Sequence, residues 1–485
     1  MVRRAAARRA LRAAAPAALA ALALLAGCGP AETPGRGAET AAGRPLPELL
    51  CPDGPPAALR GAPVVVILLD ALNPSFLTCY GGRADLTPHI DGLAAEGVRF
   101  TQAIAPAAYT ISSIASLLTG VGVGAHHTWT WKPEGNHLPA DLPTLAERFA
   151  AAGYATAAIV HSPNGSTAFG FDRGFQHFVD LWKVKRPYPR AEDCWPALDE
   201  LLAARDERPL FLWLHILEPH EPYHPPDPWR GRLDPGYTGT FTGDQVQLWS
   251  IRNREVVPDA RDLAHLRAEY EETIAYADHA VGGIRERLER AGLWDRAIVV
   301  LVSDHGEGFL EHQGLDHAGM GHGSTVYDEM IRVPLIVKLP RGVATAGAVQ
   351  AQLVASLDLL PALAELVGAA PAGAARAPGR DAVATHSESH EVHRLLATWS
   401  LRDARWKYVE TPGHPPELYD LAADPGEHHD LAAEQPGLVE SMRRRLAELA
   451  GADLALGATT GAENPAPPAD SPELQEQLRA LGYVR

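Results

Sequence analysis

Buried strands are the clearest pattern in this chain, because several short runs contain only apolar and mostly β-branched residues. Residues 64–69 read VVVILL and residues 298–302 read IVVLV, without the polar alternation of a half-exposed strand. A third run, LFLWLHI, covers residues 210–216. Runs of this kind are typical of strands that are covered on both faces of a parallel sheet. The pattern therefore predicts a parallel sheet with both faces buried.

Side chains that can bind metal stand just after two of these runs. Asp70 follows the first strand directly, and Asp304 and His305 follow the run 298–302 closely. Ligands in open α/β sheets bind beyond the carboxyl ends of the strands, so we expect these three side chains to converge there. Two carboxylates and one imidazole suit a hard to borderline cation. The sequence thus predicts a metal site at this edge.

A segment near Thr110 predicts a nucleophile beside that metal. Residues 112–119, SSIASLLT, are typical of a helix that hydroxyl caps open and that Gly120 ends. The hydroxyl of Thr110, just before this helix, would face the metal. Free amides at the helix start favour a phosphate or sulfate oxygen, and the metal would lower the pKa of the hydroxyl.

Each of these residues also has an ordinary structural explanation. An aspartate after a strand is commonly a turn residue, and a threonine before a helix commonly caps it. The pair Asp304 and His305 is more informative, because polar groups at a buried strand end are costly without a partner. The combination of the three segments favours a hydrolytic site over the structural explanation.

Many segments in one order resemble the sulfatases, a family within the alkaline phosphatase superfamily. They include VVVILLDALNPSFLTCYGG, ASLLTG, FLWLHILEPHEPY, LVSDHGEGF and ELYDLAADPGEHHDLA. The resemblance implies an α/β fold with a large mixed sheet between helices, followed by a smaller carboxyl-terminal α+β subdomain with a short antiparallel sheet. We expect the catalytic domain over residues 61–370 and the subdomain over residues 371–485.

The nucleophile position departs from the usual sulfatase motif. Sulfatases carry Cys or Ser in a Cys-x-Pro-Ser-Arg motif, and that residue is oxidised to formylglycine. Registering on residues 115–120 places Thr110 there, with Ser112 in place of Pro and Ile114 in place of Arg. A threonine cannot become formylglycine. Relatives with a threonine nucleophile, such as phosphoethanolamine transferases, act on phosphate esters and diesters, so Thr110 favours phosphorus over sulfur.

The metal ligands depart from the family pattern in the same direction. Sulfatases commonly have two adjacent aspartates after the first strand, whereas Ala71 follows Asp70 here. The resemblance therefore implies one divalent ion on Asp70, Thr110, Asp304 and His305, similar to the single metal site of the threonine transferases. Calcium is the family default, and zinc or manganese is plausible because a histidine ligand is softer than carboxylates.

Three further histidines are candidates for the substrate side. By resemblance His220 matches the histidine that contacts the transferred group or protonates the leaving oxygen, and a neutral-pH imidazole suits that work. His322 stands in a glycine-rich segment, about where sulfatases place an active-site lysine. Both could instead be ordinary loop histidines. His215, within the run 210–216, could be a site residue or a buried partner in the strand.

The first residues predict export. Residues 1–27 combine five arginines with an apolar stretch at 13–23, and the sequence Leu-Ala-Gly-Cys ending at Cys28 resembles a bacterial lipoprotein signal. Cleavage would leave Cys28 lipid-anchored in the bacterial cell envelope, in the periplasm or at the cell surface. Residues 28–60, rich in Pro, Gly and Ala, would form a flexible tether. A plain signal peptide or a transmembrane anchor is the alternative, although the apolar stretch is short for a bilayer span.

Composition is typical of a folded enzyme and excludes one class of partner. A chain of 485 residues with 46% hydrophobic residues can bury a large core. Its formal charge is −17, and loss of the arginine-rich leader would make it more negative. This acidity excludes nucleic acid as a partner. An anionic substrate must then be attracted locally, by the metal and the histidines.

Together these features predict a metal-dependent hydrolase of sulfate or phosphate esters. Thr110 would attack sulfur or phosphorus, and His220 and His322 would stabilise the transferred group or protonate the leaving oxygen. The substrate would be a sulfated or phosphorylated glycan, lipid or small molecule. Two alternatives remain: a phosphoryl-group transferase of the phosphoethanolamine or phosphoglycerol type, and a non-catalytic binding lipoprotein that kept the fold.

Overall fold

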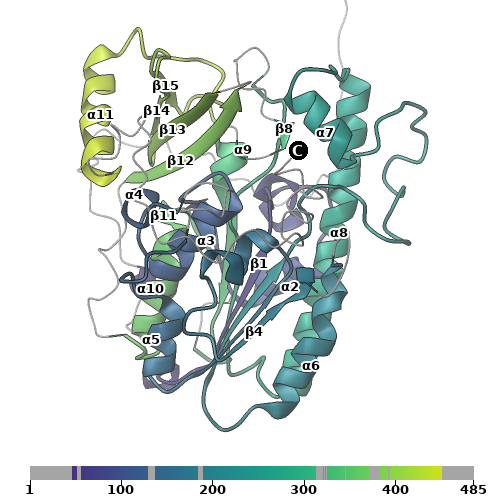
Figure 1. The fold of residues 1–485 in the computed structure, drawn as a ribbon, viewed down its shortest axis with the longest axis vertical. Coiled ribbons are helices and arrows are strands. Elements are labelled where there is room, and N and C mark those ends of the chain that lie inside the picture. Colours follow the sequence, from purple (N-terminus) through teal and green to yellow (C-terminus); the bar gives the residue numbers. More distant parts are fainter. Residues whose placement is uncertain are drawn as a thin grey trace, which may run out of the picture. The chain divides into compact units, whose positions relative to one another are not determined.

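The computed structural model describes one compact unit of the chain, which lies within residues 42–485. The described residues are 46–51, 56–128, 137–183, 189–312, 320–321, 323, 325–343, 346–370, 382–391 and 394–450 (Figure 1). The expected leader, Cys28 and His322 lie outside them. No helix within these ranges combines the length and the hydropathy that a bilayer span requires.

A mixed sheet of nine strands forms the centre of the described residues. Strand β1 runs parallel to both of its neighbours, β5 and β6, so the three apolar runs of the sequence lie side by side as expected. Strand β9 is antiparallel to β6 and β2, which makes the sheet mixed. In sheet order the path is β10 (Ala348–Gln350), β2 (Val98–Ile104), β9 (Arg332–Lys338), β6 (Ile298–Ser303), β1 (Val64–Leu69), β5 (Leu210–Ile216), β3 (Ala155–Val160) and β4 (His177–Asp180), and β11 (Val354–Ala355) pairs with β2.

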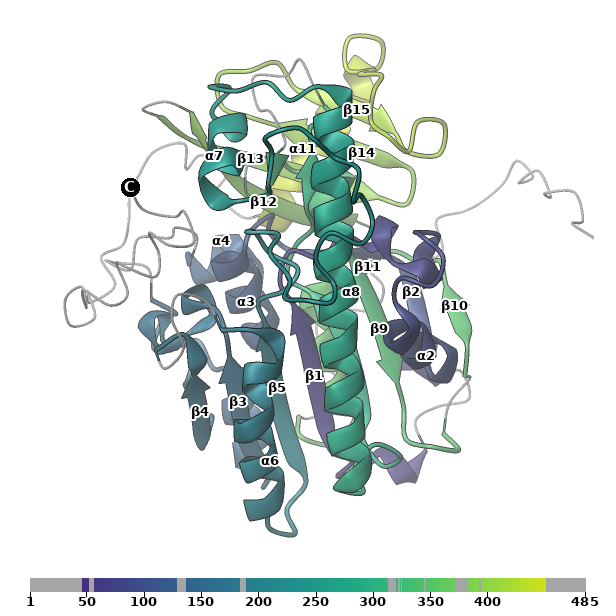
Figure 2. The same cartoon turned by 90° about the vertical axis from the view of Figure 1, so that its right-hand side faces the viewer.

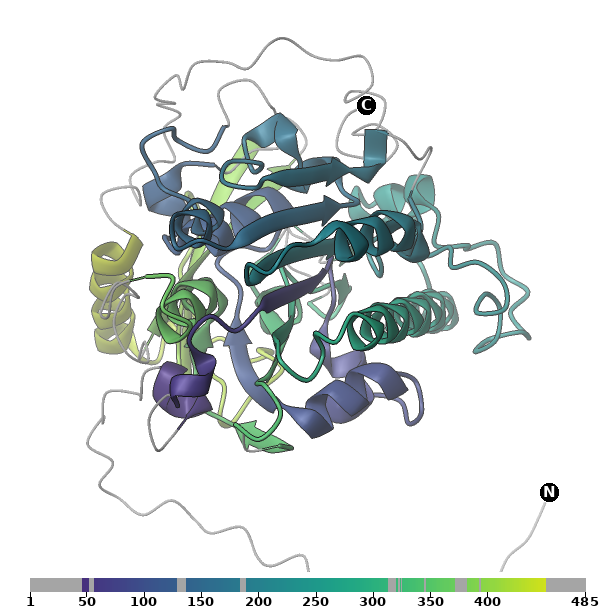
Figure 3. The same ribbon diagram turned by 90° about the horizontal axis from the view of Figure 1, so that it is seen from below.

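Helices cover both faces of this sheet, which explains why β1 contains no polar residue. Val64, Val66 and Leu68 pack into a core with α1, α3, α5 and α10. The alternate residues Val65 and Ile67 pack on the opposite side against α2, α6 and α8. Figure 2 shows α6 and α8 in front of the strands, and Figure 3 shows helices on either side of them. These helices are α1 (Leu46–Leu50), α2 (Pro88–Glu96), α3 (Thr110–Thr119), α5 (Leu145–Ala151), α6 (Cys194–Ala204), α8 (Ala260–Arg290) and α10 (Leu359–Leu366).

The expected carboxyl-terminal subdomain is present as a second sheet with one helix. Its four strands are all antiparallel, and α11 covers them through Val439, Met442 and Leu446. Arg402 and Lys407 of this sheet form ion pairs with Asp328, which begins α9 after the main sheet's loops. The elements are β12 (Ala382–Glu391), β13 (Arg394–Asp403), β14 (Trp406–Glu410), β15 (Glu417–Asp420), α11 (Pro436–Ala450) and α9 (Asp328–Ile331). The predicted fold class, a large mixed sheet between helices with a smaller α+β subdomain, is confirmed.

The carboxyl-terminal end of the expected tether is folded rather than flexible. Residues 46–50 form α1, and Leu49 and Leu50 are each 1% exposed. They belong to the core that also contains α10, and Leu59 is fully buried in the same core. The prediction of a tether up to residue 60 was therefore wrong for this end. Its leucines, which the Pro, Gly and Ala content obscured, provide enough apolar surface to be buried.

Shorter elements complete the described residues. Helix α4 (Val123–His126) follows α3, and α7 (Gln245–Arg252) precedes α8. Two short antiparallel strands, β7 (Gly308–Phe309) and β8 (Met320–Gly321), follow β6.

Candidate metal and nucleophile site

Asp70, Asp304 and His305 converge at the carboxyl ends of β1 and β6. The two strands are parallel neighbours, and Leu69 is in register with Ser303, so the residues that follow them lie next to each other. One ligand atom from each of the three side chains lies within 4.8 Å of the others, and all three residues are fully buried. His305 Nε2 is 3.5 Å from Asp70 Oδ1 and 3.4 Å from Asp304 Oδ2. The structure thus brings together the three residues expected to bind metal.

Thr110 reaches the same point from α3, of which it is the first residue. Its side chain is buried, and Oγ1 lies 3.4 Å from Asp70 Oδ1 and 3.2 Å from His305 Nε2. The first backbone N–H groups of a helix have no partner within it, so the start of α3 favours an anion there. The Thr110 hydroxyl therefore lies at a helix end that favours anions.

The expected hydroxyl caps of this helix are absent. Tyr109 is the N-cap, and its side chain makes no capping bond. Ser112 Oγ donates to the Thr128 carbonyl and Ser113 Oγ to the Ala107 carbonyl, so both hydroxyls fasten neighbouring loops. The predicted end was correct: Gly120 stands in the left-handed region at φ +74°, and a Cβ there would lie 2.4 Å from Pro361 Cγ.

The proton on His305 can be placed from its hydrogen bond. Nδ1 lies 2.9 Å from the Gly306 carbonyl oxygen, which can only accept, so Nδ1 carries the hydrogen. In the neutral ring, Nε2 then directs a lone pair toward the oxygens of Asp70 and Asp304. Asp304 Oδ2 is buried and accepts no hydrogen bond from any residue that the structure describes. The Thr110 hydroxyl lies 3.2 Å from His305 Nε2 and 3.4 Å from Asp70 Oδ1, so its one proton faces several acceptors.

A divalent cation fits this arrangement. Among the described residues, neither Asp70 nor Asp304 forms an ion pair with a lysine or an arginine. Burial, together with the charge of Asp304, raises the pKa of Asp70 to about 7. Two carboxylates, an imidazole nitrogen and the Thr110 hydroxyl form a mixed oxygen and nitrogen set, which suits calcium, manganese or zinc.

Several side chains that the sequence did not single out hold the loop after β1. Tyr270 of α8 donates from its hydroxyl to the Ala71 carbonyl at 2.6 Å and accepts the Asn73 amide at 3.0 Å. Ser303 Oγ accepts the Leu72 amide at 2.9 Å. These bonds fix the backbone beside Asp70, including Ala71, which stands at φ +60°. Only the strand pairing and the approach of α8 reveal them.

His215, the histidine with two open explanations, lies against Asp70. Its Nε2 is 3.0 Å from Asp70 Oδ2, and both side chains are buried. Burial lowers the pKa of His215 to about 4, so the ring is neutral. His161, which directly follows β3, is also fully buried, and in the part of the chain that the structure describes neither of its ring nitrogens has a hydrogen-bond partner.

His220 lies in the turn after β5 and is 3% exposed. Its Nδ1 is 2.6 Å from the Glu221 carbonyl oxygen, and its charge acts to lower the pKa of Asp70, although burial of that carboxyl outweighs it. With Arg190, Glu218 and Tyr276 it lines a pocket of about 210 Å³. His220 therefore stands close to Asp70 and beside a space that a substrate group could enter. His322 lies outside the described residues.

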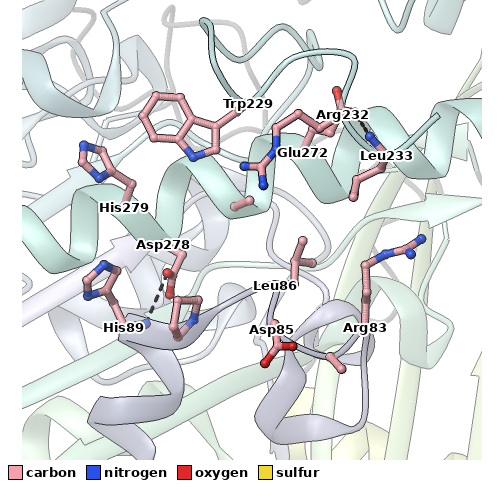
Figure 4. Close-up of a pocket in the computed structure, with 13 residues that line it drawn as sticks. Arg83, Asp85, Leu86, His89, Trp229, Arg232, Leu233, Glu272, Asp278 and His279 are labelled. Atoms are coloured by element: carbon pink, nitrogen blue, oxygen red, sulfur yellow. Dashed lines mark hydrogen bonds between the residues drawn. The ribbon is translucent and has the colours of Figure 1, made fainter. Parts of the chain in front are cut away.

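A second pocket, on the flank of α8, differs in chemistry (Figure 4). It measures about 390 Å³ and contains none of the predicted site residues. In Figure 4, Trp229 and Arg232 lie on one side of it and Leu86 and Asp85 on the other. Its buried carboxylates are already satisfied by backbone amides, Asp278 by His89 and Ile90, and Glu272 by Gly231 and Leu233.

Comparison with known proteins agrees with the resemblance in the sequence. The sequence model of the sulfatase family matches residues 63–369. Human arylsulfatase A is 26% identical over 463 residues, which cover 81% of this chain and 88% of that protein. The N-acetylgalactosamine-6-O-sulfatase of Bacteroides thetaiotaomicron is 24% identical, over 80% of this chain and 92% of that one.

Solved structures show the same fold. The phosphonate monoester hydrolase of Agrobacterium radiobacter superposes with a TM-score of 0.63 at 22% identity, over 80% of this chain and 95% of that one. A 2-O GAG sulfatase superposes with a TM-score of 0.67, also at 22% identity, over 82% of this chain and 94% of the other.

Proposed function

This chain belongs to the sulfatase family and is a sulfuric or phosphoric ester hydrolase; on that premise, we propose that it depends on a divalent metal and uses Thr110 as its nucleophile. The observation that carries the proposal is the position of the Thr110 hydroxyl. It lies at the start of α3, within 3.4 Å of Asp70 and 3.2 Å of His305. Two of the three expected metal ligands therefore hold and orient the proposed nucleophile.

Asp70, Asp304 and His305, with the Thr110 hydroxyl, would hold the cation. The buried Asp304 oxygen, which accepts no hydrogen bond from the described residues, supports such an ion. When bound, it would lower the pKa of the Thr110 hydroxyl and neutralise charge on the ester oxygens. Calcium follows from the family, and zinc or manganese from the histidine in the set.

The proposed reaction proceeds in two steps on Thr110. Its Oγ1 attacks phosphorus or sulfur, so that a new ester bond forms on Thr110 and the substrate ester bond breaks, and the proton that Oγ1 loses is balanced by the one that the leaving oxygen gains. The leaving oxygen takes a proton, for which His220 is the candidate donor. Water then attacks the same phosphorus or sulfur, releases inorganic phosphate or sulfate and restores the hydroxyl. The amino end of α3 stabilises the anionic group throughout.

Threonine at this position also supports a second candidate, a phosphoryl-group transferase. In that case an alcohol instead of water would accept the group from Thr110, as in the phosphoethanolamine and phosphoglycerol transferases, relatives of the sulfatases with a threonine nucleophile. Both candidates use the same first step. They differ only in which acceptor reaches the modified threonine, so acceptor tests separate them.

For the substrate we propose an anionic ester, with a sulfated glycan as the first class to test. Support comes from relatives, among them an N-acetylgalactosamine-6-O-sulfatase and a delta 4,5-hexuronate-2-O-sulfatase. Thr110 supports phosphate esters instead, because it cannot supply formylglycine. The pocket beside His220, with Arg190 on its wall, could receive the leaving group.

For location we propose export, with Cys28 as a lipid anchor. The support is the residue pattern of positions 1–28 alone. Metabolic labelling with a palmitate analogue in a bacterial host tests it. The label should appear on the wild-type chain and be absent from Cys28→Ala; an unlabelled wild-type chain would contradict the anchor.

The experiment that tests the proposed function compares turnover by the full-length chain across metals and esters. Metal-free protein is supplied separately with calcium, zinc or manganese, and each form is offered an aryl sulfate, a phosphate monoester and a phosphodiester. Thr110→Ala is the matched variant. We expect one ester class to be cleaved, only with metal and only with the threonine.

Three outcomes would change the account. Cleavage that survives in Thr110→Ala would remove the nucleophile, and cleavage without any divalent ion would remove the metal. A chain that cleaves none of the esters and binds no divalent ion in stoichiometric amount would instead be a binding protein. Turnover that appears only with an added alcohol would establish the transferase.

A further inference from the structure

We propose that His215 is a positioning residue: it holds Asp70 in the orientation that binds the divalent cation, and so sets the affinity of the site for metal. This inference rests on the metal site of the proposed function and adds a residue that makes no contact with substrate. Its basis is the geometry at the ends of β1, β5 and α3.

Strand register places His215 beside Asp70. In the parallel pair of β5 and β1, His215 stands opposite Leu68, and Asp70 follows two residues later, directly after the end of β1. From there its Nε2 reaches Asp70 Oδ2 at 3.0 Å. Both side chains are buried, so water does not compete for the bond. An ionised carboxylate can only accept, which makes Nε2–H of His215 the donor.

Because of this bond, the two oxygens of Asp70 have different partners. Oδ2 is engaged by His215, whereas Oδ1 faces Thr110 Oγ1 at 3.4 Å and His305 Nε2 at 3.5 Å. Rotation of the carboxylate would break the bond to His215. The imidazole therefore fixes which oxygen points toward the proposed cation and toward the nucleophile.

The other side of the ring is closed by a short turn. His215 Nδ1 has no hydrogen-bond partner among the described residues, and Gly165 lies directly against it. A Cβ at Gly165 would be 2.5 Å from Nδ1 and 3.1 Å from Cδ1 of Ile114, a residue of α3. The ring is thus wedged between the strand and the turn, and with no acceptor at Nδ1 its hydrogen belongs on Nε2. A glycine is required there because any side chain would displace the ring.

A purely structural histidine would not need this partner. The neighbours of His215 along β5, Leu214 and Ile216, are apolar and fully buried, so an apolar residue would satisfy the strand. A buried imidazole costs free energy unless its polar atoms are used, and here the one used atom is bonded to a metal ligand. Replacing a residue that hydrogen-bonds to a metal ligand commonly changes metal affinity or activity by about 10- to 100-fold.

The test uses two amides that differ in reach. In His215→Gln the side-chain nitrogen occupies about the place of Nε2 and can still donate to Asp70, whereas the shorter amide of His215→Asn cannot. Leu214→Ala is the matched control, because it removes buried volume from the same strand on the opposite face of the sheet. Calorimetric titration of each full-length, metal-free protein with calcium, zinc and manganese gives the dissociation constants.

We expect His215→Asn to weaken metal binding by about 10- to 100-fold. His215→Gln should retain most of the affinity, and Leu214→Ala should bind metal as tightly as the wild type although it unfolds at a lower temperature. Equal dissociation constants for the wild type and His215→Asn would overturn the positioning role and leave the proposed function intact. A wild-type chain that binds no divalent ion would overturn both.

A second measurement needs no variant and decides the matter if His215→Asn does not fold. Nitrogen-15 spectra of histidine-labelled wild-type protein report which ring nitrogen carries hydrogen. The proposal requires His215 in the Nε2–H form, with that proton resonance shifting when metal is added. An Nδ1–H form, or a resonance that metal leaves unchanged, would overturn it.

Discussion

Two buried acidic clusters of this chain are neutralised in opposite ways. At the joint between the main sheet and the carboxyl-terminal sheet, Asp328 pairs with Arg402 at 3.0 Å and with Lys407 at 3.1 Å, and Lys407 also pairs with Glu427 at 2.8 Å. At the proposed metal site beyond the ends of β1 and β6, called the metal edge below, Asp70 and Asp304 have no lysine or arginine partner among the described residues.

The pKa values of Asp328 and Asp70 show the same contrast, although burial also raises the pKa of Glu427, the other acid of the joint, to about 7. Although burial favours the neutral acid, Lys407 and Arg402 hold the pKa of Asp328 well below its usual range. Burial and a second carboxylate instead raise the pKa of Asp70 to about 7. A buried charge must be compensated. Where the chain supplies its own cations the cluster joins two parts of the fold, and where it supplies none the cation is expected to come from outside.

The largest expected effect separates the clusters by catalysis. Thr110→Ala removes the hydroxyl at the metal edge together with one methyl group, so turnover should fall by about 10³-fold or more while the unfolding temperature changes much less. Steady-state kinetics and calorimetry measure the two quantities. Thr110→Ser, which keeps a hydroxyl, is the control and should retain part of the activity. An alanine variant with more than a tenth of wild-type turnover would contradict the assignment of the nucleophile.

A change at the joint should lower stability and leave the metal site unchanged. Lys407→Met removes a fully buried cation from Asp328 and Glu427, and breaking one partner of a buried pair commonly costs about 3 to 5 kcal/mol. Denaturant unfolding should show this loss, whereas the metal affinity of the variant that remains folded should match the wild type. A weakened metal site in this variant would show that the two clusters are not independent.

Metal removal should lower the free energy of unfolding through the metal edge and not through the joint. A ligand at 100 times its dissociation constant stabilises the folded state by about 2.7 kcal/mol, so chelation should lower the free energy of unfolding by about that amount. Readdition of the ion should restore it. The same difference is expected in Lys407→Met, and the difference should be lost in Asp304→Asn. Unfolding curves that a chelator leaves unchanged would argue against a resident ion.

The smallest expected effect is a pH dependence from the joint. The folded pKa of Asp328 lies below its unfolded value of about 3.9, so its contribution to stability is present above that pH and is lost as the pH falls. In Asp328→Asn the free energy of unfolding should therefore depend less on pH below about 4, by up to about 1.4 kcal/mol per pH unit. Urea unfolding at a series of pH values measures this slope, and identical slopes would exclude the contribution.

Hydropathy was sufficient to predict the centre of the fold. The strands β1, β5 and β6 are unbroken apolar runs because both of their faces are buried, and this signal is local. The short helix α1 was missed, since five residues that include a proline give no helical period. The hydroxyls of Ser112 and Ser113 suggested helix caps, but they donate to carbonyls of the neighbouring loops instead, and only the folded structure shows these partners.

In the candidate site, too, the local features were predicted and the contacts between distant segments were not. Asp70, Asp304 and His305 were named because strand ends are local features, and Thr110 because it stands where a helical pattern begins. The contact between His215 and Asp70 depends on the register of two strands that are far apart in the sequence, and no local pattern encodes that register. The support from Tyr270 depends likewise on where α8 crosses the sheet.

The most direct test of the central claim is to search for the group on Thr110 itself. Enzyme mixed with its metal and a cleavable ester is quenched in acid within one turnover, digested, and analysed by mass spectrometry. The account predicts that the peptide containing Thr110 gains the mass of one phosphate or sulfate group, only with metal and on the threonine. A peptide that stays unmodified while product forms would contradict it.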